Sequence, residues 1–171
     1  LDNMLAHKLL NFCPVVMVSS LYEERPNIIT VNWCMPVSFS PCIVAISVGH
    51  GRYSHYMIEN SRQFVINVPD MELIEEVKYC GSASGKRKDK FLETGLNKMQ
   101  GIKLNVPLIS ECFAHIECQI YRSFDVGDHT IFCGSVVSVL AEKDILATDV
   151  IDLEKRKPII HLGQDQFVSL R

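Results

Sequence analysis

Gly49-His50-Gly51-Arg52-Tyr53-Ser54 has the residue types that bind an anion, and it directly follows an apolar stretch. Its two glycines let the backbone approach a ligand, Arg52 supplies a bidentate donor, and Ser54 is a candidate helix N-cap. An ordinary strand-to-helix turn with a solvent-facing arginine explains the same residues equally well. The segment therefore predicts an anion cradle only in combination with other evidence.

The same segment nearly matches the dinucleotide fingerprint G-x-G-x-x-G, and Asp70 lies in the expected downstream region. That fingerprint requires a parallel βαβ unit, whereas short connections precede this strand. Ser54 also places a side chain where close contact between helix and strand requires glycine. We therefore reject a Rossmann-type nicotinamide site.

A second anion-binding candidate covers residues 80–91. Small and hydroxyl residues come first, and four basic side chains follow: Lys86, Arg87, Lys88 and Lys90. Backbone N–H groups together with lysines suit a phosphate monoester. The segment is not a Walker A loop, because Cys80 replaces its first glycine and Arg87 its Ser or Thr. A solvated basic loop is the alternative.

Two histidines invite a chemical interpretation. Cys112-x-x-His115-x-x-Cys118 has a spacing that suggests zinc, but strand periodicity places His115 and Cys118 on opposite faces. We therefore expect His115 on a polar face and Cys118 in the core, without a metal. His129 starts a later strand, where it would serve as a donor or proton source, or simply hydrogen-bond its own loop.

Residues 27–33 contain the only tryptophan, Trp33. A lone tryptophan in a strand usually packs in the core, although a planar ligand stacked on a strand edge would use the same features. Thr30 and Asn32 would then offer polar groups to it. The sequence contains neither the G-x-S-x-G elbow of a serine hydrolase nor H-E-x-x-H.

Composition narrows the class of protein. The chain has 171 residues, 47% of them hydrophobic, a net charge of −3 and a pI near 6.1, so we expect one domain over 1–171 and no nucleic-acid partner. No apolar stretch approaches a membrane span, so we expect no membrane partner. Seven cysteines without a C-x-x-C pair fit a reducing cytoplasm.

The elements that must position these residues are mostly strands. Apolar runs at 15–20, 28–34 and 43–48 are joined by short turns, which predicts an antiparallel meander. The pattern adds a helix after Ser54, a strand at 63–68, a helix at 71–80 and irregular chain at 101–107. A hairpin is expected from 114–124 and 130–140, whose first strand alternates between a buried and a wetter face.

After that hairpin we expect a short helix at 144–149 and a tail at 158–168 that docks onto the domain. Six or more strands without βαβ rhythm indicate a mainly β barrel.

Several motifs in order resemble the flavin reductase-like and flavoredoxin family of FMN-binding split barrels. They are Pro26-Asn27-Ile28-Ile29-Thr30-Val31-Asn32-Trp33, Val37-Ser38-Phe39-Ser40-Pro41, Gly51-Arg52-Tyr53-Ser54-His55, Phe64-Val65-Ile66-Asn67-Val68-Pro69, Tyr79-Cys80-Gly81, Ser84-Gly85, Asp89-Lys90-Phe91, Gly95-Leu96, Gly127-Asp128-His129-Thr130-Ile131-Phe132-Cys133-Gly134 and His161-Leu162-Gly163. The series extends from about Cys13 to Phe167.

The resemblance implies a six-stranded antiparallel Greek-key split barrel, a homodimer and noncovalent FMN near the dimer interface. It implies that the isoalloxazine lies along two strand segments and the phosphate and ribityl chain against the two anion-binding candidates. The implied cofactor-binding residues are Thr30, Val31, Asn32, Trp33, Ser47, Val48, Gly49, Arg52, Ser54, Cys80, Ser84, Gly85, Lys86 and Lys90. His129 matches a family histidine on the nicotinamide or substrate side.

Two segments depart from the family pattern: Lys86-Arg87-Lys88 replaces arginine followed by acidic or apolar residues, and Cys34-Met35 replaces small residues. The expected function is an FMN-dependent oxidoreductase that takes electrons from NAD(P)H or a protein donor and passes them to a flavin, ferric or other acceptor. A non-enzymatic flavoredoxin-type electron carrier with a protein partner is the alternative, and a barrel that binds heme or pyridoxal phosphate is a third. The flavin would carry out hydride transfer, so no side-chain nucleophile is expected.

Overall fold

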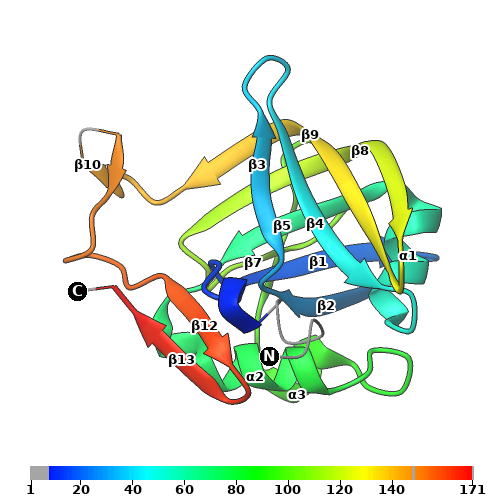
Figure 1. Cartoon of the computed structure of the whole chain (residues 1–171), viewed down its shortest axis with the longest axis horizontal. Coiled ribbons are helices and arrows are strands. Elements are labelled where there is room, and N and C mark those ends of the chain that lie inside the picture. Colours follow the sequence, from blue (N-terminus) through cyan, green and yellow to red (C-terminus); the bar gives the residue numbers. More distant parts are fainter. Residues whose placement is uncertain (1–7, 148, 171) are drawn as a thin grey trace.

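The computed structural model describes residues 8–147 and 149–170. Its main layer is one seven-stranded sheet that curls strongly on itself (Figure 1). Its strands are β1 (Val16–Tyr22), β2 (Arg25–Val31), β3 (Cys34–Ser38), β4 (Ile43–Gly49), β5 (Gln63–Val68), β8 (Ala114–Val126) and β9 (His129–Ala141). No helix of the described residues is long and apolar enough to cross a membrane.

The strand order is β2-β1-β5-β8-β9-β4-β3, and every neighbouring pair is antiparallel. The predicted antiparallel β barrel is therefore confirmed, with one more strand than the six expected. The predicted three-strand meander is wrong, because β2 and β4 do not pair with each other. The strand predicted at 28–34 ends at Val31, and β3 begins at Cys34 on the opposite edge of the sheet.

The two edges of the sheet approach each other where the chain passes from β2 to β3. There the Ser47 backbone N–H donates to the Trp33 carbonyl over 2.9 Å. This contact links the β2 end of the sheet to β4 without a continuous ladder. The sheet is thus a barrel with an opening along β2 and β4.

The barrel interior is filled by alternating apolar side chains from both halves of the sheet, among them Val18, Ile46, Phe64, Cys118 and Phe132, all at most 2% exposed. Burying a side chain of this size stabilises the fold by roughly 1.5–3 kcal/mol. The expectation of a core position for Cys118 is confirmed.

The opposite face of β8 is not wet as expected, since His115 is 4% exposed and Glu117 1%. The irregular segment 101–104 covers it, and Glu117 receives the backbone N–H groups of Ile102, Lys103 and Leu104 over 2.7 to 3.0 Å. Burial acts to raise the pKa of Glu117, but these three bonds and one from Ser138 outweigh it and lower that pKa.

Short helices cover the barrel beside its opening (Figure 1). The helical elements are α1 (Tyr53–Ser61), the 3₁₀ turn η2 (Met71–Leu73), α2 (Ile74–Ser82) and α3 (Lys90–Thr94). Ser54 is not the N-cap that we expected: α1 starts at Tyr53, two residues earlier than a Ser54 cap would give, so Arg52 occupies the cap position without a side-chain bond. Asp70 and Asp89 cap η2 and α3 through their carboxylates.

The remaining elements are short two-stranded ladders: β6 (Lys98–Met99) with β7 (Leu108–Ile109), β10 (Leu146–Ala147) with β11 (Val150–Ile151), and β12 (Ile159–Gly163) with β13 (Gln166–Ser169). The helix predicted at 144–149 is wrong; Asp144 and Asp149 have φ values of 60° and 66°, which a right-handed helix excludes. The tail docks as expected, because Val15 N–H donates to Ile159 C=O over 2.8 Å.

Candidate functional site

A cleft lies along the opening of the barrel, between β2, β4 and the C-terminal end of α2. It consists of three adjoining hollows that share wall residues, and Arg52 lines all three. The largest hollow measures about 420 Å³, within the usual range for a small-molecule site. Thr30 and Asn32 line two of the hollows, as do Gly81 and Ser82. The cleft can therefore hold one extended ligand.

One end of the cleft is formed by two strand segments that the sequence singled out. The residues there are Thr30, Val31, Asn32, Trp33, Ser47, Val48, Gly49, Arg52 and His129, together with Ile29. Val31 and Val48 are buried in the core, so only their backbone is available to a ligand. The Thr30 hydroxyl donates to the Val77 carbonyl over 2.6 Å, which ties β2 to α2.

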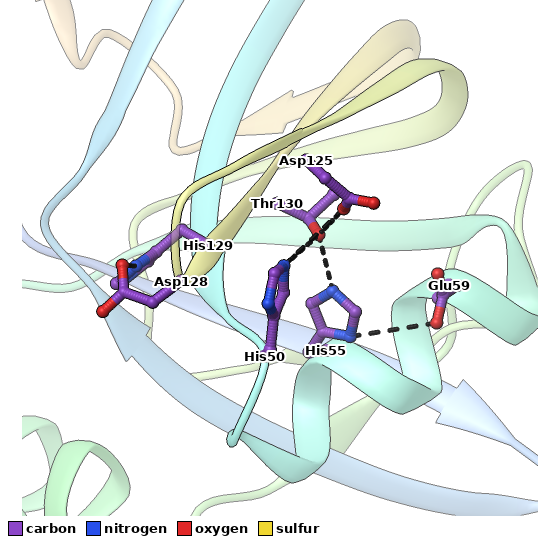
Figure 2. A network of polar contacts seen from close by, with 7 residues as sticks. All are labelled: His50, His55, Glu59, Asp125, Asp128, His129 and Thr130. Carbon is purple, nitrogen blue, oxygen red and sulfur yellow. Dashed lines mark hydrogen bonds and ion pairs between the residues drawn. The ribbon is translucent and has the colours of Figure 1, made fainter.

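Trp33 and His129 face each other at this end, with ring centroids 4.9 Å apart and planes tilted by 38°. Trp33 is 38% exposed, so it is not the core residue that a lone tryptophan usually is. His129 Nδ1 lies 2.7 Å from Asp128 Oδ1 (Figure 2), and this hydrogen bond lowers the pKa of the Asp128 carboxyl. The two rings present an aromatic surface. His129 Nε2 lies on the side of this surface that faces Gly49.

The other end of the cleft gathers donors from the Arg52 loop and the segment after α2. Arg52 is exposed, and Ser54 is buried behind it. Asn27 Nδ2 donates to Ser54 Oγ over 2.7 Å, which leaves the Ser54 O–H for another acceptor. Asn27 Oδ1 is the buried side-chain atom without a hydrogen-bond partner within residues 8–147 and 149–170.

Gly85 packs directly on that amide, since a Cβ at Gly85 would overlap Asn27 Oδ1. A side chain at position 85 would therefore displace Asn27, and with it the support of Ser54. Gly85 thus lets the segment after α2 close against β2. Cys80, Ser84 and Gly85 line this end of the cleft together with Arg52 and Ser54.

The basic residues of 86–90 do not form one anion-binding group, because Lys90 lines the cleft and Lys86 does not. Lys90 is 3% exposed, and its ammonium donates to the carbonyls of Ile28 (2.7 Å) and Cys80 (2.6 Å). Burial lowers the pKa of Lys90 to about 8. One N–H of its three remains for a ligand in the cleft that Lys90 lines. Lys86 is exposed and is not among the residues that line the three hollows.

Sequence reasoning missed a third wall, which the docked C-terminal hairpin supplies. His161 and Gln164 line the largest hollow with Lys78 of α2. His161 Nε2 lies 2.8 Å from the Gln164 carbonyl, so that nitrogen carries the proton. Its Nδ1 then accepts from the Asn32 amide over 3.1 Å. The signals in the sequence were that residues 158–168 are apolar enough to dock and that His161-Leu162-Gly163 fits the family series, and neither placed His161 at the site.

Two alternatives from the sequence fail in the structure. The strand before Gly49 pairs antiparallel on both sides, so the glycine-rich turn does not belong to a βαβ unit. Cys112, His115 and Cys118 do not converge: His115 Nδ1 lies 2.9 Å from Asn67 Oδ1, and burial raises the pKa of both thiols. Among the described residues these three do not form a group of converging ligands.

Comparison with known proteins agrees with the fold. Residues 12–161 match the model of the flavin reductase like domain, so the chain belongs to this family. An uncharacterized protein of Archaeoglobus fulgidus is 38% identical over 116 residues, which span 68% of this chain and 66% of that protein. An NADH-dependent FAD reductase of Streptomyces globisporus is 29% identical over 72% of this chain and 67% of its own.

Among solved structures, the flavoredoxin of Desulfovibrio vulgaris (Miyazaki F) superposes with a TM-score of 0.85, covering 94% of this chain and 87% of that one at 24% sequence identity. The chain therefore has the fold of the flavoredoxins and flavin reductases, a split barrel.

Proposed function

We propose that this protein is an oxidoreductase that binds FMN noncovalently in the cleft. The observation that carries the proposal is that Arg52 lines all three hollows. A guanidinium therefore lies between the end of the cleft formed by β2 and β4 and the end that gathers hydrogen-bond donors around Ser54. A planar ring with an anionic tail matches this distribution. Family membership supports it, as does the structural similarity to an FMN-binding protein of Thermus thermophilus (TM-score 0.80, 24% identity over 92% of this chain and 86% of that one).

The residues fit the phosphate and ribityl chain at the Ser54 end. Arg52, the Ser54 O–H and the third N–H of Lys90 are donors, while Cys80, Ser84 and Gly85 supply backbone. Lys86 would contribute only long-range attraction, because it is exposed outside the cleft. Thr30 to Trp33 and Ser47 to Gly49 would border the ring system.

Bound FMN would accept a hydride or electrons and pass them on. The protein would orient the ring between the two strand segments and offer His129 Nε2 at the nicotinamide or substrate side. NAD(P)H as the donor and a flavin as the acceptor are supported by the related NADH-dependent FAD reductase. A ferric or other acceptor remains part of the proposal without such support.

The visible spectrum of the purified protein, followed by anaerobic addition of NADH and of NADPH, tests this proposal. We expect a flavin spectrum, or its appearance when FMN is added, and bleaching by one of the two nicotinamides. A colourless protein whose addition leaves FMN fluorescence unchanged would overturn FMN binding.

A flavoredoxin-type electron carrier is the second candidate, supported by the close superposition on a flavoredoxin. It would use the same cleft and a protein partner instead of a nicotinamide. Steady-state oxidation of NADH or NADPH with free flavin or ferric chelate distinguishes the two. Turnover supports the enzyme; a bound flavin that neither nicotinamide reduces supports the carrier.

We also propose one functional domain over 1–171 and a homodimer. The family match over 12–161 supports the first. The exposed apolar residues Met35, Val37 and Phe39 of β3 and its turn support the second. A cytoplasmic location is consistent with seven free cysteines.

A further inference from the structure

A cluster of two histidines, an aspartate and a threonine lies at the turn of the β8–β9 hairpin (Figure 2). The Thr130 hydroxyl donates to Asp125 Oδ1 over 2.6 Å. His50 Nε2 and His55 Nε2 lie 3.1 Å and 2.7 Å from the same hydroxyl oxygen. Both imidazoles therefore direct their Nε2 atoms toward the Thr130 hydroxyl, beside which Asp125 Oδ1 also lies.

Regular elements hold each member of the cluster in place. Asp125 and Thr130 are register partners in the β8–β9 ladder, and His55 belongs to the first turn of α1. His50 lies in the turn after β4, where its backbone N–H donates to the Asp128 carbonyl over 3.0 Å. The convergence is thus built from two segments that are distant in sequence: the turn after β4 with the start of α1, and the β8–β9 hairpin.

We propose that His50 Nε2, His55 Nε2 and Asp125 Oδ1 form a binding site for a divalent transition-metal ion of the zinc type. Two imidazoles and a carboxylate are the ligands that such ions select, whereas Ca²⁺ and Mg²⁺ prefer oxygen alone. Three protein ligands leave one position for water or for the Thr130 hydroxyl.

The distances suit a small tetrahedral ion. The three ligand atoms lie within 4.8 Å of one another, and His50 Nε2 is 3.6 Å from Asp125 Oδ1. Zinc–nitrogen bonds of about 2.1 Å correspond to tetrahedron edges of about 3.4 Å. Shifts well below the length of a side chain would therefore bring all three atoms onto one ion.

The surroundings support the assignment in two further ways. His55 Nδ1 faces Glu59 Oε2 at 3.9 Å, so a carboxylate stands behind a ligating imidazole, as is common in zinc sites. The His50 side chain is 43% exposed and that of Asp125 81%, which gives an ion direct access from solvent. The His55 side chain, 11% exposed, forms the inner side of the site.

Isothermal titration of the chelator-treated full chain with ZnCl₂ tests the proposal, with His50→Asn and Asp125→Asn as site variants. Asp144→Asn, an exposed carboxylate elsewhere, and Cys42→Ser, an exposed thiol, are the controls. We expect one zinc per chain, unchanged affinity in both controls and at least tenfold weaker binding in both site variants. Glu59→Gln should weaken zinc by about tenfold, the lower end of the effect of such supporting residues.

A Co²⁺ difference spectrum of the wild-type chain gives an independent readout that does not depend on how the variants fold. Imidazole and carboxylate ligands predict visible ligand-field bands without a thiolate charge-transfer band. Thermal melts without metal check that each variant is folded. Absence of zinc binding, binding that His50→Asn and Asp125→Asn leave unchanged, or a thiolate band from the bound Co²⁺ would overturn the site. The four side chains would then be a hydrogen-bond network only.

Discussion

Lys90 and Arg52 are both basic residues of the cleft, but their surroundings give them different tasks. The Lys90 ammonium is buried and holds two carbonyls, one from β2 and one from α2. Arg52 is exposed at the junction of the three hollows. Lys90 therefore serves first to join two elements, whereas Arg52 is placed for a ligand.

Replacing Lys90 by Met should lower the stability of the protein whether or not FMN is present. The substitution keeps the apolar stem but leaves the Ile28 and Cys80 carbonyls without their donor, which costs about 1–3 kcal/mol. Urea denaturation of the FMN-free chain measures this loss in the free energy of unfolding. Lys86→Met, at an exposed position, is the control. Wild-type stability of Lys90→Met would show that these two bonds do not hold the elements together.

The lowered pKa of Lys90 also predicts how stability depends on pH. The folded chain releases this proton near pH 8, while the unfolded chain keeps it up to its ordinary pKa of 10.5. Between these values the unfolded state binds more protons, so the stability of the wild type relative to Lys90→Met should rise with pH. Urea midpoints of both proteins at pH 7, 9 and 10 measure this; a constant difference would contradict it.

At the scale of elements, Glu117 ties the irregular segment 101–104 to β8. Glu117→Gln removes the charge that accepts three backbone N–H groups, and we expect a loss of about 1–3 kcal/mol. Because the pKa of Glu117 is lowered on folding, its contribution is complete above the ordinary value of 4.5 and declines at lower pH. Chemical denaturation at pH 7 and pH 3.5 measures both effects.

The matched comparison is Glu111→Gln, which changes a half-buried carboxylate that accepts the Asn97 backbone N–H. If Glu117→Gln and wild type lose the same stability on acidification, another group accounts for the acid sensitivity.

The sequence pattern predicted β5 and the β8–β9 hairpin well, because each strand is a continuous local run of residues. The same reasoning failed at Trp33, where one apolar run divides between opposite edges of the sheet. It failed also at His115 and Glu117, which have the spacing of a wet face but lie under a segment with no regular pattern. Long-range covering of this kind leaves no local signal.

In the candidate site too, local features could be predicted from the sequence and long-range contacts could not. Thr30, Arg52 and Gly85 were identified by residue type and family order, and the structure brings them to one cleft. Burial of the lysine ammonium, the wall formed by His161 and the convergence of His50 with Asp125 depend on contacts between distant elements. Residue types alone could not show them.

At the scale of the whole molecule, residues 8–147 and 149–170 leave an apolar face exposed. Met35 is 58% exposed and Phe39 99%, and Met35 lines a hollow together with Trp33, Ser47 and Ile131. Trp33 and Ser47 also line the cleft, so a second copy seated on this hollow would cover one end of the proposed FMN site. Exposed apolar patches of this kind are typical of interfaces.

Phe39→Glu should therefore weaken the proposed homodimer, because it places a charge on the apolar face. Light scattering over a concentration series measures the mass, with Leu92→Glu, an exposed leucine of α3, as the control. A wild-type chain that stays monomeric throughout, or a Phe39→Glu dimer as stable as the wild type, would contradict the proposed interface.

Binding of FMN and of riboflavin to the wild type and to Arg52→Ala tests the central claim most directly, with Arg87→Ala as the control in the exposed basic loop. A charge-assisted hydrogen bond to phosphate contributes about 1.5–3 kcal/mol, or roughly 10- to 100-fold in Kd. We predict that Arg52→Ala loses this much affinity for FMN, while riboflavin binds nearly as before and Arg87→Ala changes neither. Equal losses for both ligands, or no loss for FMN, would contradict the placement of the phosphate beside Arg52.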